Sequence, residues 1–179
     1  MNLPNKITLS RILLVPVFLY FLLNNFSVDS PNYVALIIFI LASITDFLDG
    51  YLARKLNLVS KLGKFMDPLA DKLLVAAALI GFVQTDQISS YFVFIIISRE
   101  LIISVFRAVA ASEGVVISAS IWGKIKTNTQ ILAIIMLLLN NAPFNGLNIR
   151  IDMITLYIAT IATVISGIDY IYKNRNVLN

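Results

Sequence analysis

Cysteine and histidine are both absent from the 179 residues, and charged residues make up only 13% of the chain. Without cysteine there is no disulfide, no thiolate nucleophile and no cysteine-bound zinc. Without histidine the chain lacks the usual general base and the commonest zinc ligand. Any chemistry must therefore use carboxylates, lysine, arginine, tyrosine, serine, threonine or a hard metal ion.

Hydrophobic residues, in contrast, make up 59% of the chain, and the mean hydropathy is +0.87. Soluble domains are about 45–50% apolar and about 25% charged, so the composition excludes a soluble enzyme, a disordered chain and a fibrous protein. Only helices and closed barrels span membranes, and the long alternating pattern of barrel strands is missing. We predict an all-α integral membrane protein with a single domain over residues 1–179.

Six apolar segments have roughly the ~17–25 residues that a membrane span requires. They cover Ile7–Leu23, Tyr33–Arg54, Asp67–Val83, Tyr91–Ala111, Ser120–Leu139 and Ile151–Tyr172. Most basic residues fall on one side of this arrangement, and the other side receives only Arg150. Because lysine and arginine mark the cytoplasmic side, we expect both termini to lie in the cytoplasm. The net charge of +4 favours anionic partners.

Aspartates interrupt two of these segments at their cytoplasmic ends. Residues at helical spacing share one face of the second segment: Asp46, Asp49, Gly50, Ala53 and Arg54. Asp67 and Asp71 share a face of the third segment, and the short linker makes the two helices antiparallel neighbours. A charge inside a membrane helix costs about 2.5–3.5 kcal/mol. We therefore expect the aspartates to meet in a functional site just inside the cytoplasmic surface.

Carboxylates crowded in a low-dielectric pocket protonate unless cations compensate them. Oxygen ligands alone select Mg²⁺, Mn²⁺ or Ca²⁺, and pairs of divalent ions recur at phosphoryl-transfer sites. Gly50 and Ala53 leave room for a phosphate-bearing ligand, and Arg54 offers a forked donor for phosphate. Two other interpretations exist: a proton-coupled transporter also uses membrane carboxylates, and Asp67 alone could be a helix N-cap.

The same residues match the pattern D-x2-D-G-x2-A-R-x8-G-x3-D-x3-D at every spacing, with Gly63 as its central glycine. In this the chain resembles the CDP-alcohol phosphotransferases. The segments Leu3–Arg11, Ser98–Leu101 and Gly123–Thr127 resemble the branch of that family that forms phosphatidylglycerophosphate.

The resemblance implies a cell-membrane enzyme, with its site facing the cytoplasm, that moves a phosphatidyl group from CDP-diacylglycerol to an alcohol and releases CMP. It implies two ions, Mg²⁺ or Mn²⁺, held by Asp46, Asp49, Asp67 and Asp71, with Asp71 also the general base. The residues implied at the CDP-diacylglycerol site are Asn5, Thr8, Gly50, Ala53, Arg54, Ser60 and Gly63. Membrane lipids are expected partners and nucleic acid is not. Family members are often homodimers, which leaves a homodimer open here.

Cations near the cytoplasmic ends of the fourth and fifth segments favour an anionic acceptor: Arg99, Arg107, Lys124 and Lys126. Glycerol 3-phosphate fits best, because serine or a neutral polyol would not need these charges. Inositol phosphate and the phosphatidylglycerol of a cardiolipin synthase are alternatives. Membrane anchoring would also explain Lys124 and Lys126, whereas Arg99 and Arg107 are expected to lie deeper. Outside the family, a cation- or proton-coupled transporter and a non-catalytic scaffold remain as alternatives.

Overall fold

The computed structural model describes residues 3–24, 30–55, 61–115, 117, 120–147 and 149–175. Within these ranges it describes only the backbone at 3–6, 46–55, 61–65, 67–68, 143, 145 and 147. Of the predicted site residues, Ser60 lies outside the described residues. The side chains of the following predicted residues lie outside them too: Asn5, Asp46, Asp49, Gly50, Ala53, Arg54, Gly63 and Asp67.

The described residues form six α-helices and one short 3₁₀ helix, and none of them lies in a β-strand. The α-helices are α1 (Leu3–Asn24), α2 (Tyr33–Lys55), α3 (Lys61–Gln84), α4 (Ser90–Ser112), α5 (Ile121–Leu138) and α6 (Ile151–Lys173), and the 3₁₀ helix is η1 (Ala142–Leu147). The all-α prediction and the number of helices are confirmed.

Two helices begin earlier than the hydropathy indicated. α3 begins at Lys61 rather than at Asp67, so Asp67 lies in its second turn and is not an N-cap. Residues 61–66 include lysine, leucine and methionine, which are good helix formers. The helix therefore extends beyond the apolar run that would fit a membrane. α1 begins at Leu3 with a proline in its first turn, where the missing N–H costs nothing.

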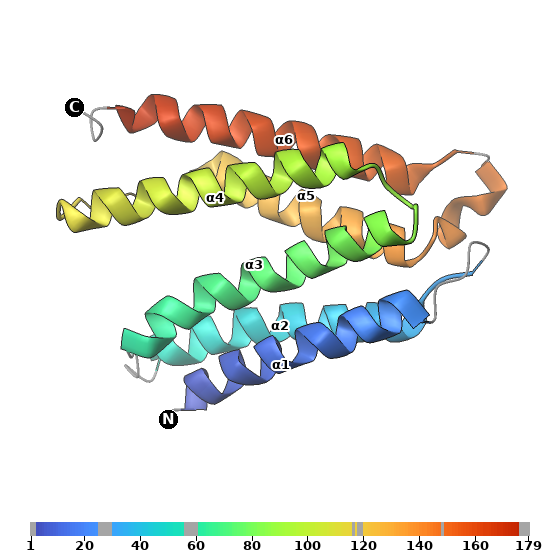
Figure 1. Ribbon diagram of the computed structural model, residues 1–179, viewed down its shortest axis with the longest axis horizontal. Helices are drawn as coiled ribbons and strands as arrows, with labels where there is room; N and C mark the ends of the chain where they lie inside the picture. Colours follow the sequence, from blue (N-terminus) through green and yellow to red (C-terminus); the bar gives the residue numbers. More distant parts are fainter. Residues whose placement is uncertain are drawn as a thin grey trace.

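The helices run alternately in opposite directions and form two groups of three (Figure 1). α1 packs against α2 and α3, while α6 packs against α4 and α5. Contacts of α3 with α4 and α5, and of α2 with α5, join the groups. The N-terminus and C-terminus lie at the same end of the molecule, where α2 ends, α3 begins and α4 ends. α2 also contacts α3 and runs in the opposite direction, which confirms the prediction that the second and third segments are antiparallel neighbours.

The main apolar core fills the half of the bundle farther from the two termini. Phe18 of α1 packs on Phe39 of α2 with ring centroids 5.8 Å apart, and Phe82 of α3 and Ile134 of α5 join the same cluster. In the other half, the buried cluster is small and lies between α4 and α6. This half therefore has room for polar side chains between α3, α4 and α5.

Asn32 ties the two groups together at the end far from the termini. Its Oδ1 accepts a hydrogen bond from the backbone N–H of Ala35 (3.1 Å) and so caps α2. Its Nδ2 donates to the carbonyl of Phe21 in α1 (2.9 Å), and its backbone N–H donates to the carbonyl of Leu138 in α5 (2.9 Å). One buried residue, through its side chain and its backbone N–H, thus fixes three helices, which leaves the opposite end as the place where a site can open.

The outer surface of the bundle is apolar on several helices. Leu13, Phe94 and Ile168 are 63%, 72% and 65% exposed, and soluble monomers rarely expose large contiguous apolar patches. Among the described residues, two stretches are long and apolar enough to cross a membrane, Ile7–Asn24 and Ile151–Lys173, and Tyr33–Thr45 is a shorter apolar helix. α4 carries three charges in its interior, so composition alone does not mark it as a span.

Candidate active site

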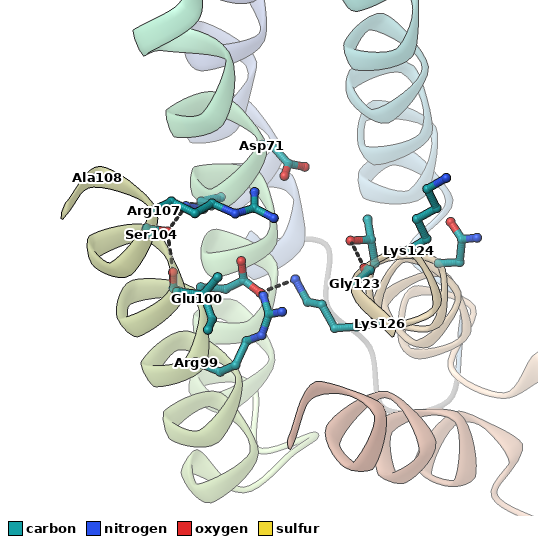
Figure 2. A pocket seen from close by; sticks show the side chains of 13 residues that line it. Asp71, Arg99, Glu100, Ser104, Arg107, Ala108, Gly123, Lys124 and Lys126 are labelled. Atoms are coloured by element: carbon teal, nitrogen blue, oxygen red, sulfur yellow. Dashed lines mark hydrogen bonds and ion pairs between the residues drawn. The ribbon is translucent and has the colours of Figure 1, made fainter. Parts of the chain in front are cut away.

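A cavity of about 870 Å³ opens between α3, α4 and α5 in the polar half of the bundle. Its lining includes five cationic and two acidic side chains: Lys72, Arg99, Arg107, Lys124, Lys126, Asp71 and Glu100. The structure therefore brings the four cations predicted for the acceptor together with Asp71, the base implied by the resemblance. Figure 2 labels these side chains, apart from Lys72.

The inner pair of cations, Arg99 and Lys126, is bound to Glu100. Lys126 of α5 forms an ion pair with Glu100 Oε1 across the cavity, and Arg99 NH1 lies 3.5 Å from the same oxygen (Figure 2). Arg99 also donates from NH2 to Ser166 Oγ of α6 (2.7 Å). These contacts hold α4, α5 and α6 together at the inner end of the cavity, and burial of the ion pair strengthens its electrostatic attraction.

The outer pair, Arg107 and Lys124, lies nearer the end of the bundle that holds the termini. Arg107 donates from Nε to the hydroxyl of Tyr170 (2.9 Å), and its guanidinium carbon lies 5.2 Å from the centroid of that ring. Both residues are exposed, and neither forms an ion pair with a carboxylate that the structure describes. The outer pair can therefore receive an anion without displacing a carboxylate.

Asp71 is exposed and borders the cavity from α3 (Figure 2). One residue further along α3, Lys72 donates a hydrogen bond to Ser104 of α4, whose hydroxyl donates to the carbonyl of Glu100. This chain of contacts fixes α3 against α4 beside Asp71. Thr8, predicted at the donor site, is completely buried in α1.

A second cavity of about 240 Å³ continues from the first toward the apolar core. The two share Asp71, Lys72, Glu100, Lys126 and Thr127, and most of the remaining lining residues of the second cavity are hydrophobic. The polar residue that lines only the second cavity is Gln130, whose Nε2 donates to Thr163 Oγ1 of α6 (3.0 Å). The site thus passes from a charged opening to an apolar interior.

The exposure of the cations does not follow their expected order of depth. Arg99 and Arg107 are expected to lie deeper than Lys124 and Lys126, but Arg107 is exposed and Lys126 is only 6% exposed. The reason is the direction in which α5 presents its residues: Lys126 lies on the face toward α4, where Glu100 compensates its charge. Residue type and distance from the helix end do not predict which face of a helix packs against its neighbours.

Several residues were not singled out by the sequence. Lys72, Ser104 and Gln130 line the cavities, whereas Ser166 and Tyr170 contact two of the cations, Arg99 and Arg107, from α6. Two patterns in the sequence could have pointed to some of these residues. Glu100, Ser104 and Arg107 recur at helical spacing on α4, and Ser166 and Tyr170 are four residues apart on α6. Polar residues on one face of apolar helices indicate a shared polar interior.

The aspartates fit divalent cations by their chemistry and their place in the fold. The donor set contains only oxygen, α2 and α3 are neighbours, and each supplies two aspartates near the end where α2 ends and α3 begins. Among the described side chains no group of three possible ligands gathers, since Asp46, Asp49 and Asp67 are described only by their backbone.

The chain belongs to the CDP-alcohol phosphatidyltransferase family, whose model matches residues 1–165. This membership confirms the resemblance and sets aside the transporter and the scaffold. A relative from Bacillus subtilis named CDP-diacylglycerol--glycerol-3-phosphate 3-phosphatidyltransferase is 47% identical over 99% of this chain and 97% of its own length. Relatives of the same name from Rickettsia typhi (39% identical, 94% of each chain) and Haemophilus influenzae (38% identical, 95% of this chain and 91% of the relative) are also similar.

Proposed function

We propose that this protein transfers the phosphatidyl group of CDP-diacylglycerol to glycerol 3-phosphate, which forms phosphatidylglycerophosphate and releases CMP. One observation carries this proposal beyond the family: Asp71 and five cationic side chains line a single cavity. A carboxylate base beside a cationic cavity suits an acceptor that has both a reacting hydroxyl and a phosphate. The names of the relatives support the same pair of substrates.

The donor is proposed to bind where α2 and α3 meet. Asp46, Asp49, Asp67 and Asp71 would hold two ions, Mg²⁺ or Mn²⁺, which would neutralise the donor diphosphate and make CMP a better leaving group. The residues proposed to contact the nucleotide and its phosphates are Asn5, Thr8, Gly50, Ala53, Arg54, Ser60 and Gly63. All six helices are proposed to span the membrane with both termini in the cytoplasm. This orientation places the cavity at the surface that water-soluble glycerol 3-phosphate reaches.

The chain's own residues then have distinct tasks. The outer pair, Arg107 and Lys124, binds the phosphate of the acceptor, since neither is committed to a described carboxylate. Asp71 takes the proton of the attacking hydroxyl, whose oxygen bonds to the phosphorus that carries diacylglycerol. The bond between that phosphorus and the oxygen of CMP breaks, and its electron pair leaves with CMP. The apolar walls of the second cavity limit water near the reacting phosphorus.

The outer pair provides a test of the acceptor. Arg107→Ala and Lys124→Ala are each expected to raise the KM for glycerol 3-phosphate about ten- to a hundredfold, because a hydrogen bond to a charged group contributes about 1.5–3 kcal/mol and 1.4 kcal/mol is a factor of ten. The KM for CDP-diacylglycerol should stay nearly unchanged, because its phosphates lie elsewhere. Initial rates of CMP release, measured while each substrate is titrated, give both constants.

Arg175→Ala is the matched control, since Arg175 is an exposed arginine at the same end of the bundle and outside the cavity. It should leave both constants unchanged. Equal increases in the two KM values for Arg107→Ala would assign that residue to the fold or the nucleotide. An unchanged acceptor KM in both variants would mean that these cations do not bind the acceptor and instead anchor the protein at the membrane surface.

A further inference from the structure

Glu100 has no task in the proposed reaction, although it lies at the inner end of the cavity. Its side chain is 17% exposed and borders both cavities. It is the one acidic residue besides Asp71 among the described residues that line the larger cavity, and it lies outside the aspartate pattern. The carboxylate compensates the charge of Lys126, and it also weakens the attraction of the inner cations for an anionic acceptor.

The contacts of Glu100 leave part of its carboxylate available. The contacts with Lys126 and Arg99 both use Oε1, and an ionised carboxylate has about four lone-pair sites. Its backbone carbonyl accepts the Ser104 hydroxyl, which fixes this turn of α4. The side chain is therefore held in one orientation while Oε2 can accept a further hydrogen bond.

An ionised carboxylate accepts hydrogen bonds and repels phosphate, so Glu100 discriminates between the two ends of a polyol phosphate. The outer pair, free of described carboxylate partners, attracts the phosphate end. Glu100 attracts a hydroxyl end. All four residues line the same cavity, so an acceptor bound there can present its phosphate to Arg107 or Lys124 and its hydroxyl groups to Asp71 and Glu100.

We propose that Glu100 is a specificity-determining residue that accepts a hydrogen bond from the hydroxyl of the acceptor that does not react. This inference rests on the proposed function. In glycerol 3-phosphate that group is the middle hydroxyl, because a terminal hydroxyl attacks phosphorus. An acceptor without the middle hydroxyl leaves Oε2 without this hydrogen bond, and a site built to bond a substrate hydroxyl discriminates against an analogue that lacks it.

The test compares glycerol 3-phosphate with 3-hydroxypropyl phosphate, which lacks the middle hydroxyl. The measured quantity is the ratio of the two kcat/KM values for CMP release from CDP-diacylglycerol. The wild-type protein should favour glycerol 3-phosphate about ten- to a hundredfold. Glu100→Met should reduce the ratio to about one, and Glu100→Gln to an intermediate value, because a neutral acceptor bonds roughly half as strongly as a charged one.

Glu113→Gln is the control, since Glu113 is an exposed carboxylate at the C-cap of α4 and outside the cavity, and it should keep the wild-type ratio. If Glu100→Met does not fold, Glu100→Gln decides, because glutamine can still accept from Lys126. A loss of activity that is equal for the two acceptors, with the ratio unchanged, would mean that Glu100 only holds Arg99 and Lys126, and would overturn the inference alone. Absence of wild-type activity with glycerol 3-phosphate would overturn the proposed function and this inference with it.

Discussion

Replacement of Asp71 by asparagine is expected to lower kcat by at least about a hundredfold, the lower range for removal of a positioned general base. An amide has nearly the shape of a carboxylate but cannot take the proton of the attacking hydroxyl at neutral pH. Asp71 is exposed to the cavity that also holds the acceptor cations. The loss should therefore appear in kcat rather than only in the KM of either substrate.

Metal titration distinguishes the loss of the general base in Asp71→Asn from the loss of a metal ligand at the other aspartates. Asp46→Asn and Asp49→Asn should chiefly raise the metal concentration needed for activity, whereas excess metal should not restore Asp71→Asn. Asp86→Asn is the control, because it makes the same chemical change in an exposed turn after α3. Its backbone is left-handed (φ 56°), which asparagine tolerates, so this variant should keep wild-type kcat. Wild-type turnover in Asp71→Asn would show that another group is the base.

Removal of divalent cations is expected to abolish CMP release entirely. The physical reason is that four aspartates near one end of neighbouring helices repel one another and cannot compensate a donor diphosphate without bound cations. Without histidine or cysteine the ligands are oxygen atoms, so Mg²⁺ or Mn²⁺ should restore the reaction. The measurement is activity in excess EDTA, followed by titration of each metal in turn.

Thermal unfolding in EDTA is the control for this experiment, because a metal-free protein that unfolds would also lose activity. The bundle should remain folded, since its main core lies in the half of the molecule away from the aspartates. Full activity in EDTA, with removal of the metal verified by elemental analysis, would contradict the metal assignment.

The helices could be predicted closely from the sequence because apolar runs with short polar links leave few alternatives. The start of α3 could not, because Lys61 to Met66 is too polar for a membrane span and yet helical. Hydropathy reports the preference of a segment for lipid, whereas the helix continues as long as backbone hydrogen bonding and helix propensity allow it.

Spacing within one helix predicted that Asp67 and Asp71 share a face of α3; Asp71 borders the cavity, and the side chain of Asp67 lies outside the described residues. The site was not predictable where it depends on how helices face one another. The pairing of Lys126 with Glu100 joins residues 26 positions apart on different helices, and no periodicity reveals it. Likewise Tyr170 is an ordinary aromatic residue of an apolar helix until α6 places its hydroxyl against Arg107.

The cavity is proposed to bring glycerol 3-phosphate to the phosphatidyl donor. The most direct measurement is CMP release from CDP-diacylglycerol by the purified protein, with glycerol 3-phosphate, glycerol, serine, inositol and inositol phosphate supplied in turn. We expect CMP only with glycerol 3-phosphate, in equal amount to phosphatidylglycerophosphate. CMP release at the same rate with inositol phosphate, or without any acceptor, would contradict the account.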